Sequence, residues 1–153
     1  MKSTINYISE LNCFHRWLAT NYLPPLSQLL WYRLMALFNQ SGWETEIIAD
    51  NATLMQLVGV KREATFIAQV RRPLLENRLL LLYRGRKGHP NRYRLMPLAP
   101  ENDMIYIYQD ELRLNDEIYQ FAPTAQKLGT DVFQTLRMLS KEDYNRLTKN
   151  LTI

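Results

Sequence analysis

Cationic and polar side chains recur along one side of residues 61–77. At 100° per residue, this side presents six residues, none of them acidic: Lys61, Arg62, Thr65, Ala68, Gln69 and Arg72. The opposite side holds Glu63, Ile67, Val70 and Leu74, and the helical spacing of its three apolar residues predicts that they pack on a core. Lys, Arg, Gln and Thr side chains reach base edges and phosphates in a DNA groove, and Ala68 leaves room for close approach. A solvated helix face is the alternative, but the lack of acidic residues favours groove contact.

A second group of cations lies in the segment 84–94, RGRKGHPNRYR, which holds no carboxylate. Its basic residues are Arg84, Arg86, Lys87, Arg92 and Arg94. Basic residues can serve only to protect an exposed strand edge against aggregation. Lysine would do that equally well, whereas four of these five are arginine, which matches phosphate better. We therefore expect this segment to follow a phosphate backbone, and we interpret the interleaved Tyr83, Tyr93 and Leu95 as core residues.

Residues that could catalyse a reaction are not grouped in this sequence. It holds no glycine-rich phosphate loop and no metal-ligand spacing. The single Cys13 has no second cysteine to pair with and lies among apolar residues, so we interpret it as a small buried hydrophobe. His15 and His89 are far apart, and neither has a nucleophile nearby. We expect a protein that is not an enzyme and that takes no metal and no cofactor.

The charge of the chain is divided unevenly. Residues 1–98 hold 13 Lys and Arg against 6 Asp and Glu, whereas residues 99–153 hold 6 against 9, and the chain as a whole carries +4. This division predicts a basic domain over 1–98 that binds a polyanion and an acidic appendage over 99–153. No secretory leader and no apolar run of membrane-spanning length is present, so we expect a cytoplasmic protein without membrane contact.

Two helices should precede the cationic segments. Asn6 can cap the first, whose apolar stripe would hold Ile8, Leu11, Phe14 and Leu18. The pair Pro24-Pro25 would end it, because proline supplies no amide hydrogen. Ser27 would cap the second helix, which is apolar nearly all round and should lie at the centre of the core until Gly42 closes it.

The elements after residue 42 follow a recognisable order. A short strand within 43–48, a short helix from Asp50 or Asn51 to Val58, a turn at Gly59-Val60 and the helix 61–77 come first; Pro73 should kink that last helix. Strands at 79–84 and 92–96 then flank the turn GRKGHPN. The expected fold is mainly α with a small β-hairpin wing (α+β), a winged helix-turn-helix.

Three segments carry a family resemblance: NCFHRWLATNYL (12–23), LLWYRLMALFNQSGW (29–43) and GRKGHPNRYRLMPL (85–98). They resemble the N-terminal winged-helix domain of DnaD-like replication initiation proteins of Gram-positive bacteria and their phages. The resemblance covers about residues 5–98. It implies binding of double-stranded DNA, self-association and a role beside other replication proteins. The residues to which it assigns DNA contact are Lys61, Arg62, Thr65, Gln69 and Arg72 in the helix, and Arg84, Arg86, Lys87 and Arg92 in the wing.

The appendage has apolar faces that need another surface to pack against. Residues 104–108 (MIYIY) predict a strand or tether, 130–139 an amphipathic helix, and 140–143 a new helix cap. The covering surface could be the first domain or a second copy of the chain, and we favour a homodimer. Two other functions fit the same pattern: a winged-helix transcriptional regulator, and a winged helix that binds only proteins.

Overall fold

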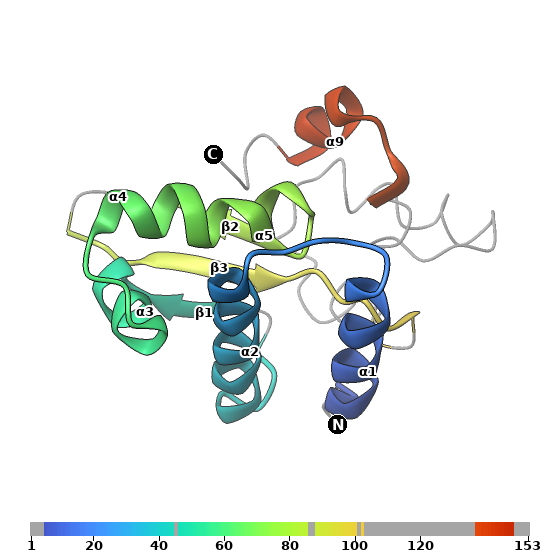
Figure 1. The fold of residues 1–153 in the computed structure, drawn as a ribbon, viewed down its shortest axis with the longest axis horizontal. Helices are drawn as coiled ribbons and strands as arrows, with labels where there is room; N and C mark the ends of the chain where they lie inside the picture. Colours follow the sequence, from blue (N-terminus) through green and yellow to red (C-terminus); the bar gives the residue numbers. More distant parts are fainter. Residues whose placement is uncertain (1–4, 45, 86–87, 101, 103–136, 149–153) are drawn as a thin grey trace.

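The structure, a computed structural model, describes residues 5–44, 46–85, 88–100, 102 and 137–148. Its helices are α1 (Tyr7–Leu18), α2 (Pro25–Gln40), α3 (Asn51–Val58), α4 (Glu63–Thr65), the π-helix η1 (Phe66–Arg71), α5 (Arg72–Glu76) and α9 (Lys141–Thr148). Its strands are β1 (Glu46–Ala49), β2 (Leu80–Tyr83) and β3 (Asn91–Leu95). The expected mixture of helices with a small antiparallel sheet is confirmed. Figure 1 shows α4, η1 and α5 joined into one long helix that crosses α2.

The three strands form one antiparallel sheet in the order β1-β3-β2. Glu46 pairs with Arg94 between β1 and β3, and Leu81 pairs with the same Arg94 between β2 and β3. Successive side chains of a strand point to opposite faces, so Tyr93 and Leu95 share the face opposite Arg94. Both are fully buried. The hairpin predicted from residues 79–96 therefore exists, and β1 extends it by one strand.

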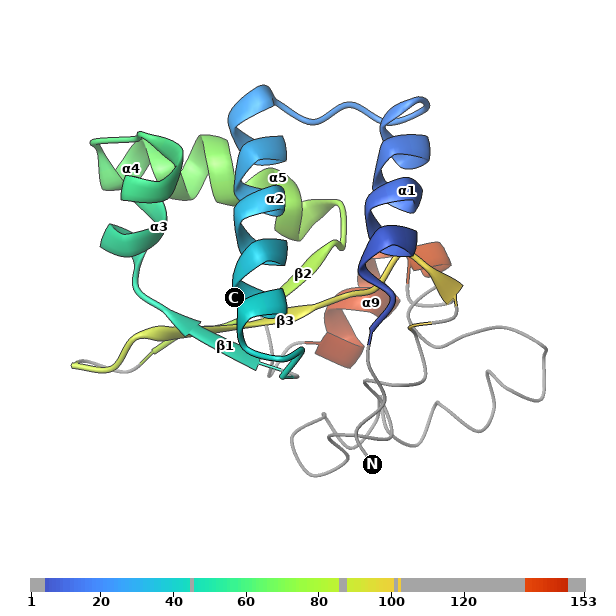
Figure 2. The same cartoon turned by 90° about the horizontal axis from the view of Figure 1, so that it is seen from below.

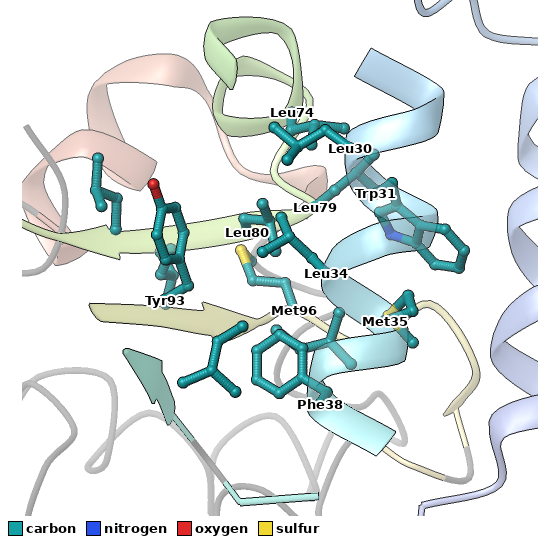
Figure 3. Packing of buried hydrophobic residues seen from close by; sticks show 14 of the residues in the cluster. Leu30, Trp31, Leu34, Met35, Phe38, Leu74, Leu79, Leu80, Tyr93 and Met96 are labelled. Carbon is teal, nitrogen blue, oxygen red and sulfur yellow. The ribbon is translucent and has the colours of Figure 1, made fainter. Parts of the chain in front are cut away.

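The core is built around α2, as its apolar composition predicts. Figure 3 shows Leu30, Trp31, Leu34, Met35 and Phe38 of this helix beside buried residues of α5 and the strands. Helix α1 lies alongside α2 in both cartoon views (Figures 1 and 2), and Phe14 stacks on Trp31 with ring centroids 3.8 Å apart. This aromatic pair adds dispersion and burial where α1 packs against α2.

Several expectations for the first two helices are wrong. Asn6 does cap α1, since its side chain accepts a hydrogen bond from the Ser9 amide at 3.1 Å. Ile8, however, is 70% exposed, and Cys13 is only partly buried. Helix α1 already ends at Leu18, several residues before the two prolines. Pro25 instead begins α2, where its missing amide hydrogen costs nothing.

Ser27 does not cap α2, because it is the third residue of the helix, lies within its first turn and is fully buried. Its hydroxyl donates a hydrogen bond of 2.7 Å to the carbonyl of Val70 and lies 3.4 Å from that of Gln69. Pro73 has no amide hydrogen for the preceding turn, and that turn is the π-helix η1. A π turn therefore stands where a kink was expected, and the Ser27 hydroxyl of α2 donates to a carbonyl of that turn.

We predict that Ser27→Ala lowers the free energy of unfolding by about 1–3 kcal/mol, because a buried carbonyl loses a donor that water cannot replace. Ser41→Ala is the matched control, since the Ser41 hydroxyl donates to the Phe38 carbonyl at an exposed helix end. Urea denaturation of both variants measures the difference. Equal losses of unfolding free energy would show that the Ser27 hydrogen bond to η1 stabilises the fold no more than a hydrogen bond at an exposed helix end does.

The buried carboxylate of Glu10 joins α1 to the segment that follows β3. This side chain accepts hydrogen bonds from the amides of Leu98 (3.0 Å) and Ala99 (3.1 Å) and from Asn102 Nδ2 (3.0 Å). Asn102 in turn binds both backbone groups of Asn6. Burial raises the pKa of Glu10 above its usual value, and the three hydrogen bonds lower it in part. Residues on both sides of position 98 therefore contact α1 directly.

The raised pKa of Glu10 has a consequence for stability. The folded state holds this proton more tightly than the unfolded state, so the contribution of Glu10 to stability decreases as pH rises from about 4.5 through the folded-state pKa. Glu10→Gln cannot titrate. The free energy of unfolding of the native chain minus that of the variant should therefore fall with pH in this window. Denaturation curves between pH 4 and 8 test it, and a constant or rising difference would contradict the assignment.

The described part of the acidic appendage packs against the first domain. Asp143 donates its amide to Ser140 Oγ at 3.1 Å, which confirms the predicted cap. Tyr144 is 6% exposed, and its hydroxyl donates to Met96 Sδ at 3.2 Å. The expected strand at 104–108 and most of the expected helix at 130–139 lie outside the described residues. Within the described ranges, no helix has the length and apolar content that a membrane crossing requires.

Candidate nucleic-acid interface

The turn before the long helix is set by local signals in the sequence. Asp50 caps α3 as predicted, accepting the Thr53 amide at 2.7 Å. Hydrogen bonds from the hydroxyl and the amide of Thr53 lower the pKa of Asp50, so this carboxylate is charged at neutral pH. Gly59 ends α3 with φ +75, a conformation that side chains rarely adopt. Three residues separate Gly59 from the start of the long helix at Glu63, so this short turn holds α3 and α4 close together.

Most of the predicted contact residues of the long helix lie on its outer face. Five are exposed: Lys61, Arg62, Ala68, Gln69 and Arg72. Thr65 is half-buried, so it is less accessible than expected. We call the five exposed residues the basic face. Lys61 and Arg62 stand just before the first helical turn and Arg72 begins α5, so the basic face runs along the whole helix.

The inner face of the long helix differs from the expected one. Glu63 is exposed and accepts a hydrogen bond from Asn51 Nδ2 at 3.5 Å, so it does not pack on the core. Val70 and Leu74 are buried as predicted, but Phe66 and Arg71 are buried with them. Hydrogen bonds in a π-helix join residues five apart, which places Arg71 on the same side as Phe66. A regular α-helix would place Arg71 away from Phe66, so the α-helical spacing of the sequence does not predict that this arginine is buried.

Arg71 connects three elements behind the basic face. Its Nη1 donates to Asn51 Oδ1 at 2.8 Å and to the Tyr93 hydroxyl at 3.0 Å. Its guanidinium carbon lies 5.5 Å from the ring centre of Phe66. Asn51 Oδ1 also accepts from Asn91 Nδ2 at 3.2 Å. These bonds fix the long helix relative to α3 and β3, and so fix the basic face relative to the hairpin.

The hairpin loop places one predicted cation clearly in solvent. Arg84 is exposed at the end of β2. Gly85 follows it and donates its amide to Asn91 Oδ1 at 2.8 Å, and a Cβ at this position would lie 2.1 Å from the carbonyl oxygen of His89. Only glycine permits so close an approach of the two sides of the loop. Residues 86 and 87, where Arg86 and Lys87 were predicted to contact phosphate, lie outside the described residues.

The two arginines of β3 are not equivalent to Arg84. Arg92 is half exposed, but it forms an ion pair with Glu46 at 3.4 Å and its guanidinium lies 4.7 Å over the Tyr83 ring. Arg94 is fully buried, so its inclusion among the phosphate-binding cations is wrong. The alternation along β3 places both arginines on the face opposite Tyr93. That signal was present in the sequence, but nothing local indicated that this face is covered.

Comparisons with known proteins identify no relative. No protein-family model, no curated protein and no solved structure matches the chain.

The Arg71 contacts predict a measurable effect of one hydroxyl. Tyr93→Phe should lower the free energy of unfolding by about 1.5–3 kcal/mol, because a buried cation loses an acceptor. Tyr32→Phe is the control: Tyr32 is 41% exposed, and this change should stay within about ±0.5 kcal/mol. Urea denaturation followed by circular dichroism measures both. Similar small losses would show that Arg71 is satisfied without Tyr93.

Proposed function

We propose that this protein binds double-stranded DNA, with the basic face of the long helix in a groove and the hairpin loop on the phosphate backbone. The observation that carries the proposal is the common exposure of Lys61, Arg62, Gln69 and Arg72 along a single helix. A helix is the right width for the major groove, and these side chain types bind bases and phosphates. Glu63 and Glu76 flank the face and would disfavour phosphates directly beside them.

We interpret the arrangement as a winged helix-turn-helix. The order α2, β1, α3, long helix, β2, β3 and the strand order β1-β3-β2 support this interpretation. The turn at Gly59 joins α3 to the long helix, which corresponds to the second helix of the motif and is the one that enters the groove. The hairpin between β2 and β3 corresponds to the wing.

The two parts of the interface would contribute differently. Lys and Arg contacts to phosphate release counterions, so they supply affinity that depends on salt and little on sequence. Gln69 can donate and accept in a bidentate contact with adenine and would supply discrimination between base pairs. Ala68 beside it lets the backbone of the helix approach the groove closely.

The finer role that we propose is in replication initiation, and its support is the resemblance of residues 5–98 to DnaD-like domains. A transcriptional regulator would instead select a short palindrome. Selection of bound fragments from native and random DNA, at stated salt, distinguishes the two: a replication protein should recover origin DNA, and a regulator a single operator. Self-association through the acidic appendage stays a prediction.

Arg62→Ala should weaken binding to every duplex and reduce the slope of log affinity against log salt by about 0.9, as expected for one lost phosphate contact.

Gln69→Ala should cost about 1–3 kcal/mol of binding free energy on the preferred duplex and less on random DNA. The charge-matched control is Arg33→Ala, an exposed arginine on α2 outside the basic face. Fluorescence anisotropy with a labelled duplex at several salt concentrations measures all three. If Arg62→Ala and Arg33→Ala have the same duplex affinity and salt slope, the basic face does not bind DNA. A module that binds only proteins then becomes the better hypothesis.

A further inference from the structure

A cavity of about 540 Å³ opens between the long helix, β2 and α9. Five cations from these elements and from the residues that flank β2 line it: Arg71, Arg72, Arg78, Arg84 and Lys141. Among the described residues that line the cavity, Glu76 carries the one carboxylate. Ile67, Leu75 and Leu82 contribute apolar surface. Five cations against one carboxylate give the described wall a net positive charge, which stabilises an anion in the cavity.

Arg71 gives the cavity a charge that solvent does not screen. The side chain is 97% buried, since only 3% of its surface is exposed. Its two described acceptors, Asn51 and the Tyr93 hydroxyl, are both neutral, and its Nε has no hydrogen-bond partner. A guanidinium stays protonated in proteins, and a buried charge without a counter-ion is costly. An anion in the adjacent cavity would offset that cost.

Three of the other cations reach the cavity from the surface. Arg72, Arg84 and Lys141 are exposed, and within the described part of the chain none of them has a carboxylate at ion-pair distance. Arg72 belongs to the basic face and Arg84 to the hairpin loop, so a duplex that touches both would bring its backbone to the mouth of this cavity. Lys141 comes from α9, which Arg78 holds in place by donating to the Leu139 carbonyl at 2.8 Å.

We propose that this cavity is a phosphate-binding site completed by Lys141, and that its occupant is a phosphate of the DNA backbone. The second clause rests on the proposed function; the first does not. The same chemistry would accept a free phosphate or the phosphate of a nucleotide, and the cavity is large enough for either. Through Lys141, the acidic C-terminal part of the chain would contribute directly to the binding of a polyanion.

The test uses the full chain with Lys141→Ala, which removes an exposed side chain and should fold, and Lys141→Arg, which keeps the charge. Arg33→Ala is again the charge-matched control. In the first arm, anisotropy with a labelled duplex at several salt concentrations gives affinity and salt slope. In the second arm, thermal unfolding is measured in potassium phosphate and in potassium chloride at equal ionic strength. A ligand that binds only the folded state raises Tm.

A backbone phosphate as occupant predicts that Lys141→Ala reduces the salt slope by about 0.9 and that Lys141→Arg restores it. A free phosphate as occupant predicts that phosphate raises the Tm of the native chain and of Arg33→Ala, but not that of Lys141→Ala. The proposal is overturned if Lys141→Ala matches Arg33→Ala in both arms.

Failure of the proposed function has a different signature. In that case Arg62→Ala leaves duplex binding unchanged while phosphate still raises the Tm of the native chain but not of Lys141→Ala.

Discussion

The lack of an amide hydrogen at Pro73 is the constraint on which the candidate interface depends. A proline inside a helix leaves a carbonyl of the preceding turn without its usual donor. In this chain that turn is the π-helix η1, and the Ser27 hydroxyl lies beside two of its carbonyls, 2.7 Å from that of Val70 and 3.4 Å from that of Gln69. The wider turn rotates Arg71 inward, under Phe66, and leaves Gln69 exposed. Which residues of the long helix face solvent therefore depends on the π turn that precedes Pro73, and the Ser27 hydroxyl of α2 binds a carbonyl of that turn.

Once Arg71 is inside, its charge must be satisfied there. Taking a guanidinium out of water costs several kcal/mol unless good hydrogen bonds remain. Asn51 and Tyr93 provide two of them, one from the start of α3 and one from the middle of the sheet. Because Asn51 also binds Asn91, the bonds that satisfy the cation also hold the long helix, α3 and β3 in one arrangement. A core of this kind is more specific in geometry than an apolar one, since small shifts would leave a buried donor unpaired.

Local signals in the sequence predicted local structure well. Asn6 and Asp50 cap the helices they were expected to cap, and Gly59 makes the expected turn, because each acts on backbone groups within a few residues. The errors concern residues whose partners are distant in the chain. Ser27 binds a carbonyl 43 residues later, and Glu10 binds an amide 88 residues later. Periodicity cannot reveal such contacts, so the sequence predicts neither the burial of Ser27 nor that of Glu10.

Partners that are distant in the chain also distinguish the cations of the candidate interface from one another. Arg84 has no described partner to give up and so can bind a phosphate at little cost. Arg92 would first have to weaken its ion pair with Glu46 and its stacking on Tyr83, whose combined effect offsets part of any new contact. The π turn and the pairing on β3 thus divide a run of arginines that look alike in sequence into three groups. Arg62, Arg72 and Arg84 are exposed and available to an anion, and Arg92 is available in competition with its internal partner. Arg71 is buried, so it would act on an anion through its charge from within the core.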